Sequence, residues 1–249
     1  MLKEERQQLI LKILDEEQKV IVSDLKMRLS VSEDTIRRDL KELDGLGLVK
    51  RVHSGALKIG PAVSDFEQRQ SIDPTTKEIL AHHALPFLKE NSIIIIDGST
   101  TNLKLVESLP TDFKATIITN SPIIAFELSK FEFIETIMLG GKLEKRSIVN
   151  LGIETIETLN TVRADLYVAG VHNIDSDHGI TVHTQLEAQV KYKMGSVSNE
   201  ILAMATKDKI ETVSNFVCTD INDITHLITE KLPVYITDKY RNKNIQVIN

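Results

Sequence analysis

The sequence has few of the residues on which several common kinds of protein depend. It contains a single cysteine, Cys218, among 249 residues, which excludes an internal disulfide framework and a metal site built from thiolates. The apolar neighbours of Cys218 favour a buried, inert thiol over a nucleophile. Tryptophan is absent and aromatic residues make up only 4% of the chain, so we expect isoleucine, leucine and valine to form the core.

Long apolar runs are also missing. The longest aliphatic run, residues 93–96, is far shorter than the roughly 20 residues that a membrane-spanning helix needs. The N-terminal residues alternate in charge and lack the apolar core of a secretory signal. We therefore expect a cytoplasmic protein that does not bind a membrane.

Three histidines lie close together in the sequence without forming a metal motif. The spacing of His172, His178 and His183 fits no compact ligand pattern, and no cysteine accompanies them. We expect neither a metal site nor a cofactor.

The net charge of −6 argues at first against a nucleic-acid partner, yet the charge is unevenly distributed. Residues 1–60 contain 12 lysines and arginines and 11 acidic residues, which leaves 18 and 25 for the rest of the chain. The stretch from residue 48 to residue 59 contains Lys50, Arg51, His53 and Lys58 but no acidic residue. Because DNA affinity depends on local neutralisation of phosphates, this basic strip matters more than the total charge.

The chain is expected to form two domains joined by a linker. Glycine and proline punctuate the region from residue 60 to residue 74, which is poor in large apolar residues. We place a first domain at residues 1–58, a linker at 59–74 and an α/β domain at 75–249. In the α/β domain, short apolar runs alternate with amphipathic segments, which is typical of βα units and a largely parallel sheet. We expect strands at 92–97, 115–119, 135–139, 165–171, 201–206, 215–219, 226–229 and 234–237, and helices at 75–90, 101–109, 122–130, 153–160 and 186–198.

The first domain has the pattern of three helices followed by a hairpin. An apolar stripe predicts a helix over residues 3–17, and a short β-branched stretch at 20–24 leads into a second helix near residues 25–29. Ser23 or Asp24 is placed to cap that second helix. After a tight turn, Ser32 is placed to cap a third helix that begins at Glu33.

The third helix presents a polar and basic surface. Ile36, Leu40 and Leu43 follow the helical period and are expected to face the core, while Thr35 and Arg38 share another face. Residues 48–58 then form two short basic strands around a turn at 54–55, which is a wing. A helix of this width fits the DNA major groove, and we predict DNA contacts from Ser32, Thr35, Arg37, Arg38, Lys50, Arg51 and His53.

A purely structural interpretation of this helix competes with the DNA-binding one. Asp34, Asp39 and Glu42 are near enough in sequence to pair with Arg37 and Arg38, and charged helix faces are often only solvated. Taken alone the two interpretations are balanced. The full order of helix, helix, capped turn, basic helix and basic hairpin favours DNA binding.

The α/β domain contains a candidate anion site. Its first apolar strand leads into Asp97, Gly98, Ser99, Thr100 and Thr101 at the start of a helix. Backbone N–H groups at a helix start, joined by serine and threonine hydroxyls, suit a phosphate, and glycine permits close approach of a ligand. The alternative is an ordinary strand-to-helix loop.

Two further strands end in similar polar turns. Thr119 and Asn120 precede a helix that starts at Pro122, and Gly140, Gly141 and Lys142 follow the next strand. The carboxyl ends of parallel strands lie along one edge of a sheet, where ligands bind in open α/β folds. We therefore predict one pocket lined by all three turns.

Several of these segments together resemble the DeoR/GlpR family of bacterial sugar-metabolism repressors. The resemblance covers the whole chain and is carried by residues 32–40, 47–56, 97–101, 119–120, 140–141, 152 and 187–191, with Glu5 and Arg6 at the start. It implies that Arg37 and Arg38 contact DNA and that residues 53–55 turn the wing.

The resemblance also implies a fold and a ligand for the α/β domain. The family's sensor domain is similar in fold to ribose-phosphate isomerases and glucosamine-phosphate deaminases, and it binds sugar phosphates. By this resemblance Ser99, Thr100 and Thr101 hold the phosphate, while Asp97, Asn120 and Lys191 lie near the sugar.

This sequence departs from the family pattern at three places. Ser54 stands where a second glycine is usual in the wing turn, and serine tolerates turns. Residues 169–173 replace a stretch like Gly-Ala-Asp-Gly, and residues 205–210 lack the early aspartate of the usual motif but keep Lys209. We expect both of these segments to influence the choice of sugar, and we include Lys209 among the effector-binding residues.

The sequence predicts a transcriptional repressor of a carbohydrate-utilisation operon, not an enzyme. Its expected partners are double-stranded operator DNA, a phosphorylated sugar that releases it from the operator, and further copies of itself in a homodimer or homotetramer. An alternative is a sugar-phosphate isomerase-like enzyme fused to a DNA-binding head, in which Asp97 and Lys191 would serve catalysis. Another is a DNA-binding protein whose sensor has lost its ligand.

Overall fold

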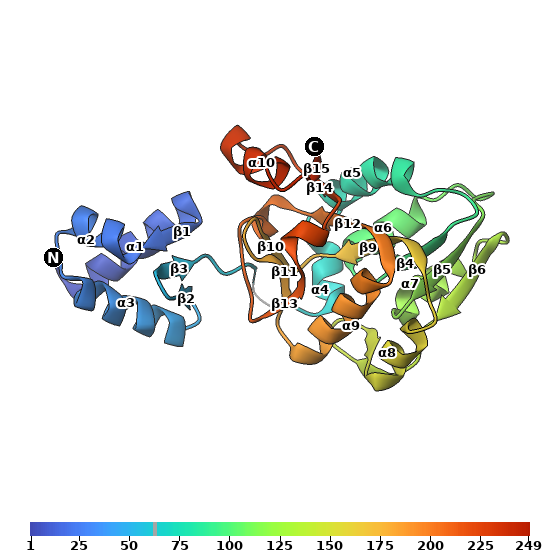
Figure 1. Cartoon of the computed structure of the whole chain (residues 1–249), viewed down its shortest axis with the longest axis horizontal. Helices are drawn as coiled ribbons and strands as arrows, with labels where there is room; N and C mark the ends of the chain where they lie inside the picture. The colour runs from blue at the N-terminus through green and yellow to red at the C-terminus, as the bar shows by residue number, and fades with distance from the viewer. Residues whose placement is uncertain (62–63) are drawn as a thin grey trace.

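The N-terminal head of the molecule is a three-helix domain with a small antiparallel sheet (Figure 1). The structure, a computed structural model, describes residues 1–61 and 64–249. Helices α1 (Lys3–Glu17), α2 (Val22–Leu29) and α3 (Glu33–Gly45) surround a core that includes Ile10, Leu25, Ile36, Leu40 and Leu43. Strands β2 (Lys50–Val52) and β3 (Gly55–Leu57) form the wing. The predicted winged helix-turn-helix is confirmed.

Local capping and one ion pair fix the third helix. The Ser32 side chain accepts a hydrogen bond from the Thr35 backbone N–H over 3.2 Å, as the sequence predicted for an N-cap. Arg6 of α1 reaches Asp39 of α3 with Nε and Oδ2 2.5 Å apart, and both side chains are nearly buried. A buried bidentate pair of this kind sets the angle between the two helices.

The start of the second helix differs from the prediction. A third strand, β1 (Lys19–Ile21), pairs with β3, and α2 begins directly after it at Val22 without a side-chain cap. Neither Ser23 nor Asp24 is the cap, because the backbone carbonyl of Ser54 in the wing turn accepts from the Val22 N–H over 2.8 Å. A tertiary contact thus replaces the local cap.

The C-terminal domain is built on a parallel sheet of seven strands in the order β15-β14-β12-β9-β4-β5-β6. These are β4 (Ile93–Ile96), β5 (Ala115–Thr119), β6 (Ile134–Met138), β9 (Ala164–Gly170), β12 (Ser198–Ala205), β14 (His226–Thr229) and β15 (Gln246–Ile248). All neighbouring strands in the sheet run parallel. The chain order reverses between β4 and β9, which makes their carboxyl ends the topological switch point.

Helices cover both faces of this sheet, which explains its continuous apolar strands (Figure 1). Ile94 and Ile96 face α5 (Pro74–Ala84), α6 (Thr100–Glu107) and α7 (Pro122–Leu128). Ile95 faces the opposite layer, which contains α8 (Ile153–Leu159), α9 (Gln185–Ser196) and α10 (Val234–Arg241). Together with the head, this arrangement confirms the predicted α/β fold class.

Two smaller sheets and three short 3-10 turns complete the domain. Strands β10 (Asn173–Asp175), β11 (Gly179–Val182) and β13 (Phe216–Thr219) form one sheet, and β7 (Lys142–Glu144) pairs with β8 (Val149–Leu151). The turns are η1 (Leu85–Phe87), η2 (Lys207–Lys209) and η3 (Ile221–Asp223). In the described ranges 1–61 and 64–249, none of the helices combines the length and the apolarity needed to cross a membrane.

One predicted strand is wrong and the predicted linker contains a helix. Residues 234–237 belong to α10, where Ile236 and Tyr240 bury one helical face; the β-branched pattern misled the prediction. Within residues 59–74, α4 (Phe66–Ser71) buries Phe66 against the layer of α5 and α6. The domain boundaries at 58 and 75 stay predictions.

Candidate nucleic-acid interface and ligand cavity

The two arginines of α3 remain available for a partner. Arg38 is exposed and forms no ion pair with any residue in the described part of the chain, and Arg37 has only a long contact of 3.8 Å to Glu33. Two of the three acids considered in the sequence analysis pair with other residues. Asp39 pairs with Arg6, and Glu42 pairs with Lys3 over 2.5 Å. The purely structural interpretation of the arginines, in which these acids neutralise them, therefore loses its main support.

The wing places its predicted residues on two different sides. The Arg37 guanidinium lies 3.5 Å from the His53 carbonyl oxygen, which brings the exposed tip of the wing beside α3. Arg51 is exposed as well. Lys50 instead points toward the C-terminal domain, where its Nζ donates to Asn215 Oδ1 over 2.9 Å.

Ser32 and Thr35 lie at the first turn of α3. Their hydroxyl oxygens are 2.9 Å apart, so part of their hydrogen-bonding capacity is used in the cap. Ser32 is exposed and Thr35 is half-buried, at the same end of the helix as Arg37. The structure thus places Ser32, Thr35, Arg37 and Arg38 in the first half of α3, with His53 beside Arg37. The Arg51 backbone N–H donates to Asp44 near the other end of α3, and Lys50 contacts the C-terminal domain.

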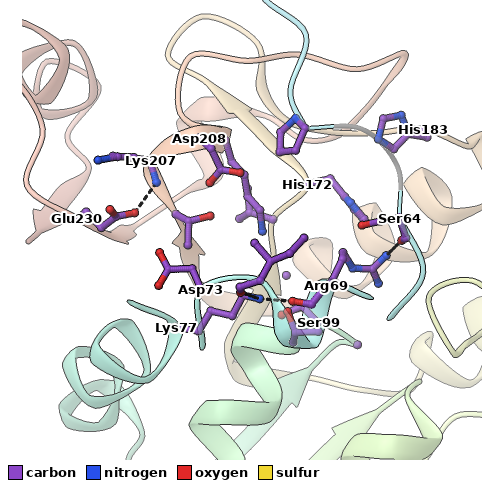
Figure 2. Close-up of a pocket in the computed structure, with 18 residues that line it drawn as sticks. Ser64, Arg69, Asp73, Lys77, Ser99, His172, His183, Lys207, Asp208 and Glu230 are labelled. Atoms are coloured by element: carbon purple, nitrogen blue, oxygen red, sulfur yellow. Dashed lines mark hydrogen bonds between the residues drawn. The ribbon is translucent and has the colours of Figure 1, made fainter. Parts of the chain in front are cut away.

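A cavity of about 380 Å³ opens at the carboxyl ends of β4, β9, β12 and β14 (Figure 2). The cavity thus lies at the end of the half of the sheet that contains β9, β12 and β14, and not of the half that contains β5 and β6. It is lined by residues from these strand ends, from η2 and from the α4–α5 region: Pro61, Ser64, Arg69, Ile72, Asp73, Lys77, Gly98, Ser99, Thr100, Gly170, Val171, His172, His183, Thr206, Lys207, Asp208, Lys209 and Glu230.

Four of the predicted effector residues line this cavity: Gly98, Ser99, Thr100 and Lys209. Ser99 is the N-cap of α6 and its hydroxyl accepts from the Asn102 backbone N–H over 2.9 Å. A Cβ at Gly98 would lie 2.3 Å from a Val149 methyl group, so the backbone of this turn requires glycine. The helix start therefore faces the cavity, as an anion site requires.

Other predicted residues lie beneath the cavity or beside it. Asp97 is buried under the floor, where it binds Lys191, the Tyr167 hydroxyl over 2.5 Å and the Gly170 N–H over 2.7 Å. Thr101 is buried in the first turn of α6. These side chains support the turn that forms the floor.

The turns after β5 and β6 stay outside the cavity. Asn120 Nδ2 donates to the Asn150 carbonyl over 3.0 Å, and Thr119 Oγ1 accepts from the Ser121 N–H over 3.1 Å. The remaining predicted residues, Gly140, Gly141 and Lys142, are exposed at the start of the β7–β8 hairpin. The sequence predicted one pocket lined by all three turns. In the structure only the turn after β4 lines the cavity, because β5 and β6 extend away from the switch point.

The cavity contains basic residues that the sequence analysis did not select. Arg69 comes from α4, Lys77 from α5 and Lys207 from η2 (Figure 2). Lys77 Nζ donates to the carbonyls of Arg69 and Ile72, so it also caps the end of α4. No local motif marks these residues, since only the packing of α4 on the sheet brings them to the strand ends.

Four cations, Arg69, Lys77, Lys207 and Lys209, share this site with three carboxylates, Asp73, Asp208 and Glu230. Burial, with the positive charges of Lys77, Arg69 and Lys191, lowers the pKa of Lys209 to about 8, although Asp208 acts in the opposite direction. Burial also lowers the pKa of Arg69 and of Lys77. Lys209 forms no ion pair with the residues described at 1–61 and 64–249. Desolvated like charges of this kind favour a bound anion.

The opposite wall of the cavity carries two histidines (Figure 2). The ring centroids of His172 and His183 are 5.7 Å apart, and His172 Nε2 lies 3.2 Å from Glu187 Oε1. Burial raises the pKa of Glu187, but the hydrogen bond and charge of His172, with Lys191 and His183, bring it down to about 2. Burial and the neighbouring His172 lower the pKa of His183.

The third histidine lies apart from this pair. His178 Nδ1 is 2.6 Å from Asp175 Oδ1 in the turn between β10 and β11. Across the described residues, no three His, Cys, Asp or Glu side chains are grouped so that they could hold a metal ion.

Two family models match the chain at positions that agree with this architecture. A model for the DeoR-like helix-turn-helix domain matches residues 6–61, and one for the DeoR C terminal sensor domain matches residues 72–231. The chain belongs to the DeoR family. This DeoR-family protein is therefore a DNA-binding transcriptional regulator with a C-terminal sensor domain.

Relatives within the DeoR family align over nearly the whole chain. The chain is 30% identical to the HTH-type transcriptional regulator GolR of Listeria innocua, covering 98% of this chain and 97% of GolR. It is 32% identical to the HTH-type transcriptional repressor GlcR of Bacillus subtilis, covering 94% and 90% of the two chains. With the L-fucose operon activator of Haemophilus influenzae the identity is 29%, over 91% of each chain.

Solved structures overlap with parts of this DeoR-family chain. Ribose 5-phosphate isomerase A of Neisseria gonorrhoeae is 16% identical, with a TM-score of 0.40 over 55% of this chain and 53% of the isomerase. The full-length sorbitol operon regulator SorC of Klebsiella pneumoniae is 11% identical, with a TM-score of 0.39 over 84% and 96% of the two chains.

The family assignment decides against the enzyme alternative. The DeoR-family relatives are named as transcriptional regulators and not as enzymes. Asp97 and Lys191, the two residues considered for catalysis, bind each other beneath the cavity.

Proposed function

We propose that this DeoR-family regulator represses a carbohydrate-utilisation operon and leaves its operator when a phosphorylated sugar occupies the cavity. The observation that carries the proposal is the position of Lys209. This buried lysine lies near other cations and lines the cavity, which is also lined by residues at the start of α6. A phosphate dianion would pair with Lys209, which forms no ion pair among the described residues and has Asp208 as its acidic neighbour. The name of GlcR, a repressor, supports the direction of regulation.

The phosphate is proposed to bind at the first turn of α6. Ser99 and Thr100 line the cavity, and the free backbone N–H groups of a helix start point toward any anion placed there. Lys209, Arg69 and Lys77 bring positive charge from η2, α4 and α5 to the same cavity. Two neighbouring helices and a turn far away in the sequence would thus contribute to one anion site.

The sugar is proposed to extend toward the histidine wall. His172 and His183 offer imidazole donors and acceptors, and the ionised Glu187 behind His172 fixes the orientation of that ring. Sugar hydroxyls both donate and accept, so they match such a wall. The volume of about 380 Å³ lies within the range of roughly 300–1,000 Å³ that is usual for small-molecule sites.

The head is proposed to place α3 in the major groove of operator DNA. Arg37 and Arg38 reach base edges or phosphates, and the exposed tip of the wing at His53 follows the adjacent backbone. Ser32 and Thr35 at the first turn of α3 and the exposed Arg51 of the wing are proposed to add phosphate contacts. Two heads of a homodimer or homotetramer would read two half-sites.

The segment between head and sheet offers a direct route for control. Pro61, Ser64, Arg69, Ile72 and Asp73 line the cavity, and all lie in the predicted linker at 59–74. A ligand that draws Arg69 and Lys77 toward its phosphate moves the chain that carries the DNA-binding head. Binding of the sugar and of DNA is then coupled, and the coupling acts equally in both directions.

A stability screen combined with DNA binding tests this function. The full chain is heated with glucose 6-phosphate, fructose 6-phosphate or ribose 5-phosphate and with the matching unphosphorylated sugars. A ligand present at 100 times its Kd stabilises the folded state by about 2.7 kcal/mol. We expect one phosphorylated sugar to raise the Tm and to weaken binding to a duplex selected from random DNA. No stabilisation by any phosphorylated sugar, or stabilisation without any effect on DNA binding, would contradict the proposal.

A further inference from the structure

A short stretch of chain, residues 212–215, lies between the cavity and the wing. It follows η2, which contributes Lys207 and Lys209 to the cavity, and it precedes β13. Each of its four residues contacts either a residue that lines the cavity or a residue of the DNA-binding head. The segment thus connects the two sites by a route that does not run along the linker.

Two contacts join the segment to the cavity. The Thr212 hydroxyl donates to the carbonyl oxygen of Lys209 over 2.7 Å. The Ser214 hydroxyl oxygen lies 2.8 Å from His183 Nδ1. Lys209 and His183 both line the cavity, on different walls, so a ligand that shifts either residue acts on this segment.

Two further contacts join the segment to the head. The Val213 N–H donates to the Lys58 carbonyl over 3.1 Å, and Val213 pairs with Ile59 as an isolated parallel bridge. Lys50 Nζ in strand β2 donates to Asn215 Oδ1 over 2.9 Å. Lys50 is one of the predicted DNA-binding residues, so this contact places a basic group of the wing on the sensor domain.

The close fit beside the wing depends on a glycine. A Cβ at Gly60 would lie 1.7 Å from Asn173 Nδ2 and 2.9 Å from Thr212 Oγ1. Asn173 in turn donates to the Thr212 hydroxyl over 2.8 Å. The chain leaving the wing is thus packed directly on the segment.

The segment is held so that it cannot adjust freely. Glu211 has a φ of 55°, in the left-handed region that a residue with a side chain enters only at a cost. Its buried carboxylate accepts from the Ser176 N–H over 3.1 Å and pairs with Lys239 of α10. The Ser214 N–H donates to Thr181 Oγ1 over 2.8 Å. These contacts tie the segment and the residue before it to β11, α10 and the turn after β10, so the segment has one defined position between η2 and the wing.

We propose that residues 212–215 couple the cavity to the wing, with Ser214 and Asn215 as positioning residues for Lys50. A phosphorylated sugar displaces Lys209 and His183, the segment follows them, and Val213 moves the base of the wing at Lys58. Asn215 competes with DNA phosphate for the Lys50 ammonium. This inference rests on the proposed function for the identity of the ligand, but the contact between Lys50 and Asn215 is tested without any ligand.

A double-mutant cycle tests the competition for Lys50. In the full chain, Asn215→Asp turns the neutral acceptor into a carboxylate and strengthens its hold on Lys50. We expect DNA affinity to fall about tenfold, and to change less than about twofold when the same substitution is made in a Lys50→Ala background. Asn199→Asp, an exposed position at the start of β12, adds the same charge as a control. An equal loss in both backgrounds, or an equal loss in the control, would overturn the proposed competition.

A second experiment separates coupling from ligand binding. Thr212→Val and Ser214→Ala are combined to remove both hydroxyls that bind cavity residues, and Ser214→Thr alone serves as the variant that keeps a hydroxyl. Calorimetry measures the Kd of the phosphorylated sugars from the screen, and a DNA-binding titration measures DNA affinity with and without them. We expect the sugar Kd to stay within about threefold while the sugar-dependent change in DNA affinity falls about fivefold or more. The Ser214→Thr variant should retain that change.

The outcomes distinguish this inference from the proposed function. An undiminished effect of the sugar on DNA binding in the double variant would overturn the coupling role of the segment. If no phosphorylated sugar binds the wild type, the proposed ligand class fails, and the cycle between Lys50 and Asn215 still decides whether the segment positions the wing.

Discussion

Lys191 of α9 pairs with Asp97 at the end of β4, and both side chains are buried. Burial lowers the pKa of Lys191, but the charges of Asp97 and Glu187 outweigh it and raise the pKa above its usual value, so Lys191 keeps its positive charge. The Gly170 carbonyl accepts a second hydrogen bond from Lys191 over 2.9 Å. The family resemblance implies that both residues lie near the sugar, which stays a prediction; in the structure they join β4, β9 and α9 at Gly170, which lines the cavity.

Removing the lysine from this pair should destabilise the domain. Lys191→Met leaves the Asp97 carboxylate buried without its cation, which costs about 3 kcal/mol or more in the free energy of unfolding. Urea unfolding measures this change. Lys193→Met, a less buried position on the same helix, is the matched control and should cost less than about 1 kcal/mol. Similar losses for the two variants would mean that the pair does not hold the floor.

The arginines of α3 should matter for DNA and not for stability. Replacing Arg37 and Arg38 together by alanine should reduce operator affinity about a hundredfold or more. The Tm should change little, because both side chains are exposed and the pair of Arg37 with Glu33 is a surface contact. A gel shift and a thermal scan check the two effects, with Lys12→Ala of α1 as control. Unchanged DNA affinity in the double variant would remove α3 as the recognition helix.

Ligand affinity should depend on pH through Lys209. Its pKa of about 8 means that it is charged below that pH and loses its proton above it. A phosphate dianion binds the charged form, so affinity should fall as the pH rises above about 8. A sugar phosphate is already doubly charged there, since its second pKa is about 6. Calorimetry in buffers of different ionisation enthalpy should detect proton uptake on binding near pH 8.5. Lys209→Met should abolish both the uptake and the pH dependence; a wild-type affinity that is flat from about pH 7 to pH 9 would contradict this.

A negative charge at the start of α6 should block the phosphate. Thr100→Asp places a carboxylate where the anion is proposed to bind, while an aspartate in the first turn still suits the helix dipole. We expect normal DNA binding that phosphorylated sugars no longer weaken. Thr158→Asp on the exposed side of α8 adds the same charge elsewhere and should leave the response intact. A response of Thr100→Asp equal to that of the wild type would place the ligand at another site.

Local patterns were sufficient to predict the head and most of the sheet. Ile36, Leu40 and Leu43 share one helical face, and Ser32 is the cap that its position before Glu33 indicated. The run at residues 93–96 became a strand buried on both faces, which is what a continuous apolar segment in a parallel sheet requires. The helix face, the cap and the apolar strand are each determined by residues close together in the sequence, so a local pattern is sufficient to predict them.

The cavity could be predicted only in part, because its lining depends on strand order. The turn after β4 was correctly placed at the cavity, but Gly140 follows β6, at the far edge of the sheet from the switch point. Arg69 lies in a segment that looked like a linker, and Lys77 lies on a helix without a motif. The roles of all these residues in binding stay predictions until the variants are measured.

Control of DNA binding by an anion in the cavity is tested most directly by comparing the wild type with Lys209→Met. DNA affinity of each full chain is titrated with and without the phosphorylated sugar that stabilises the wild type, and with its unphosphorylated form. We predict that the phosphorylated sugar weakens DNA binding of the wild type about tenfold or more and leaves Lys209→Met unaffected. An equal response of both proteins, or an equal response of the wild type to the unphosphorylated sugar, would contradict this account.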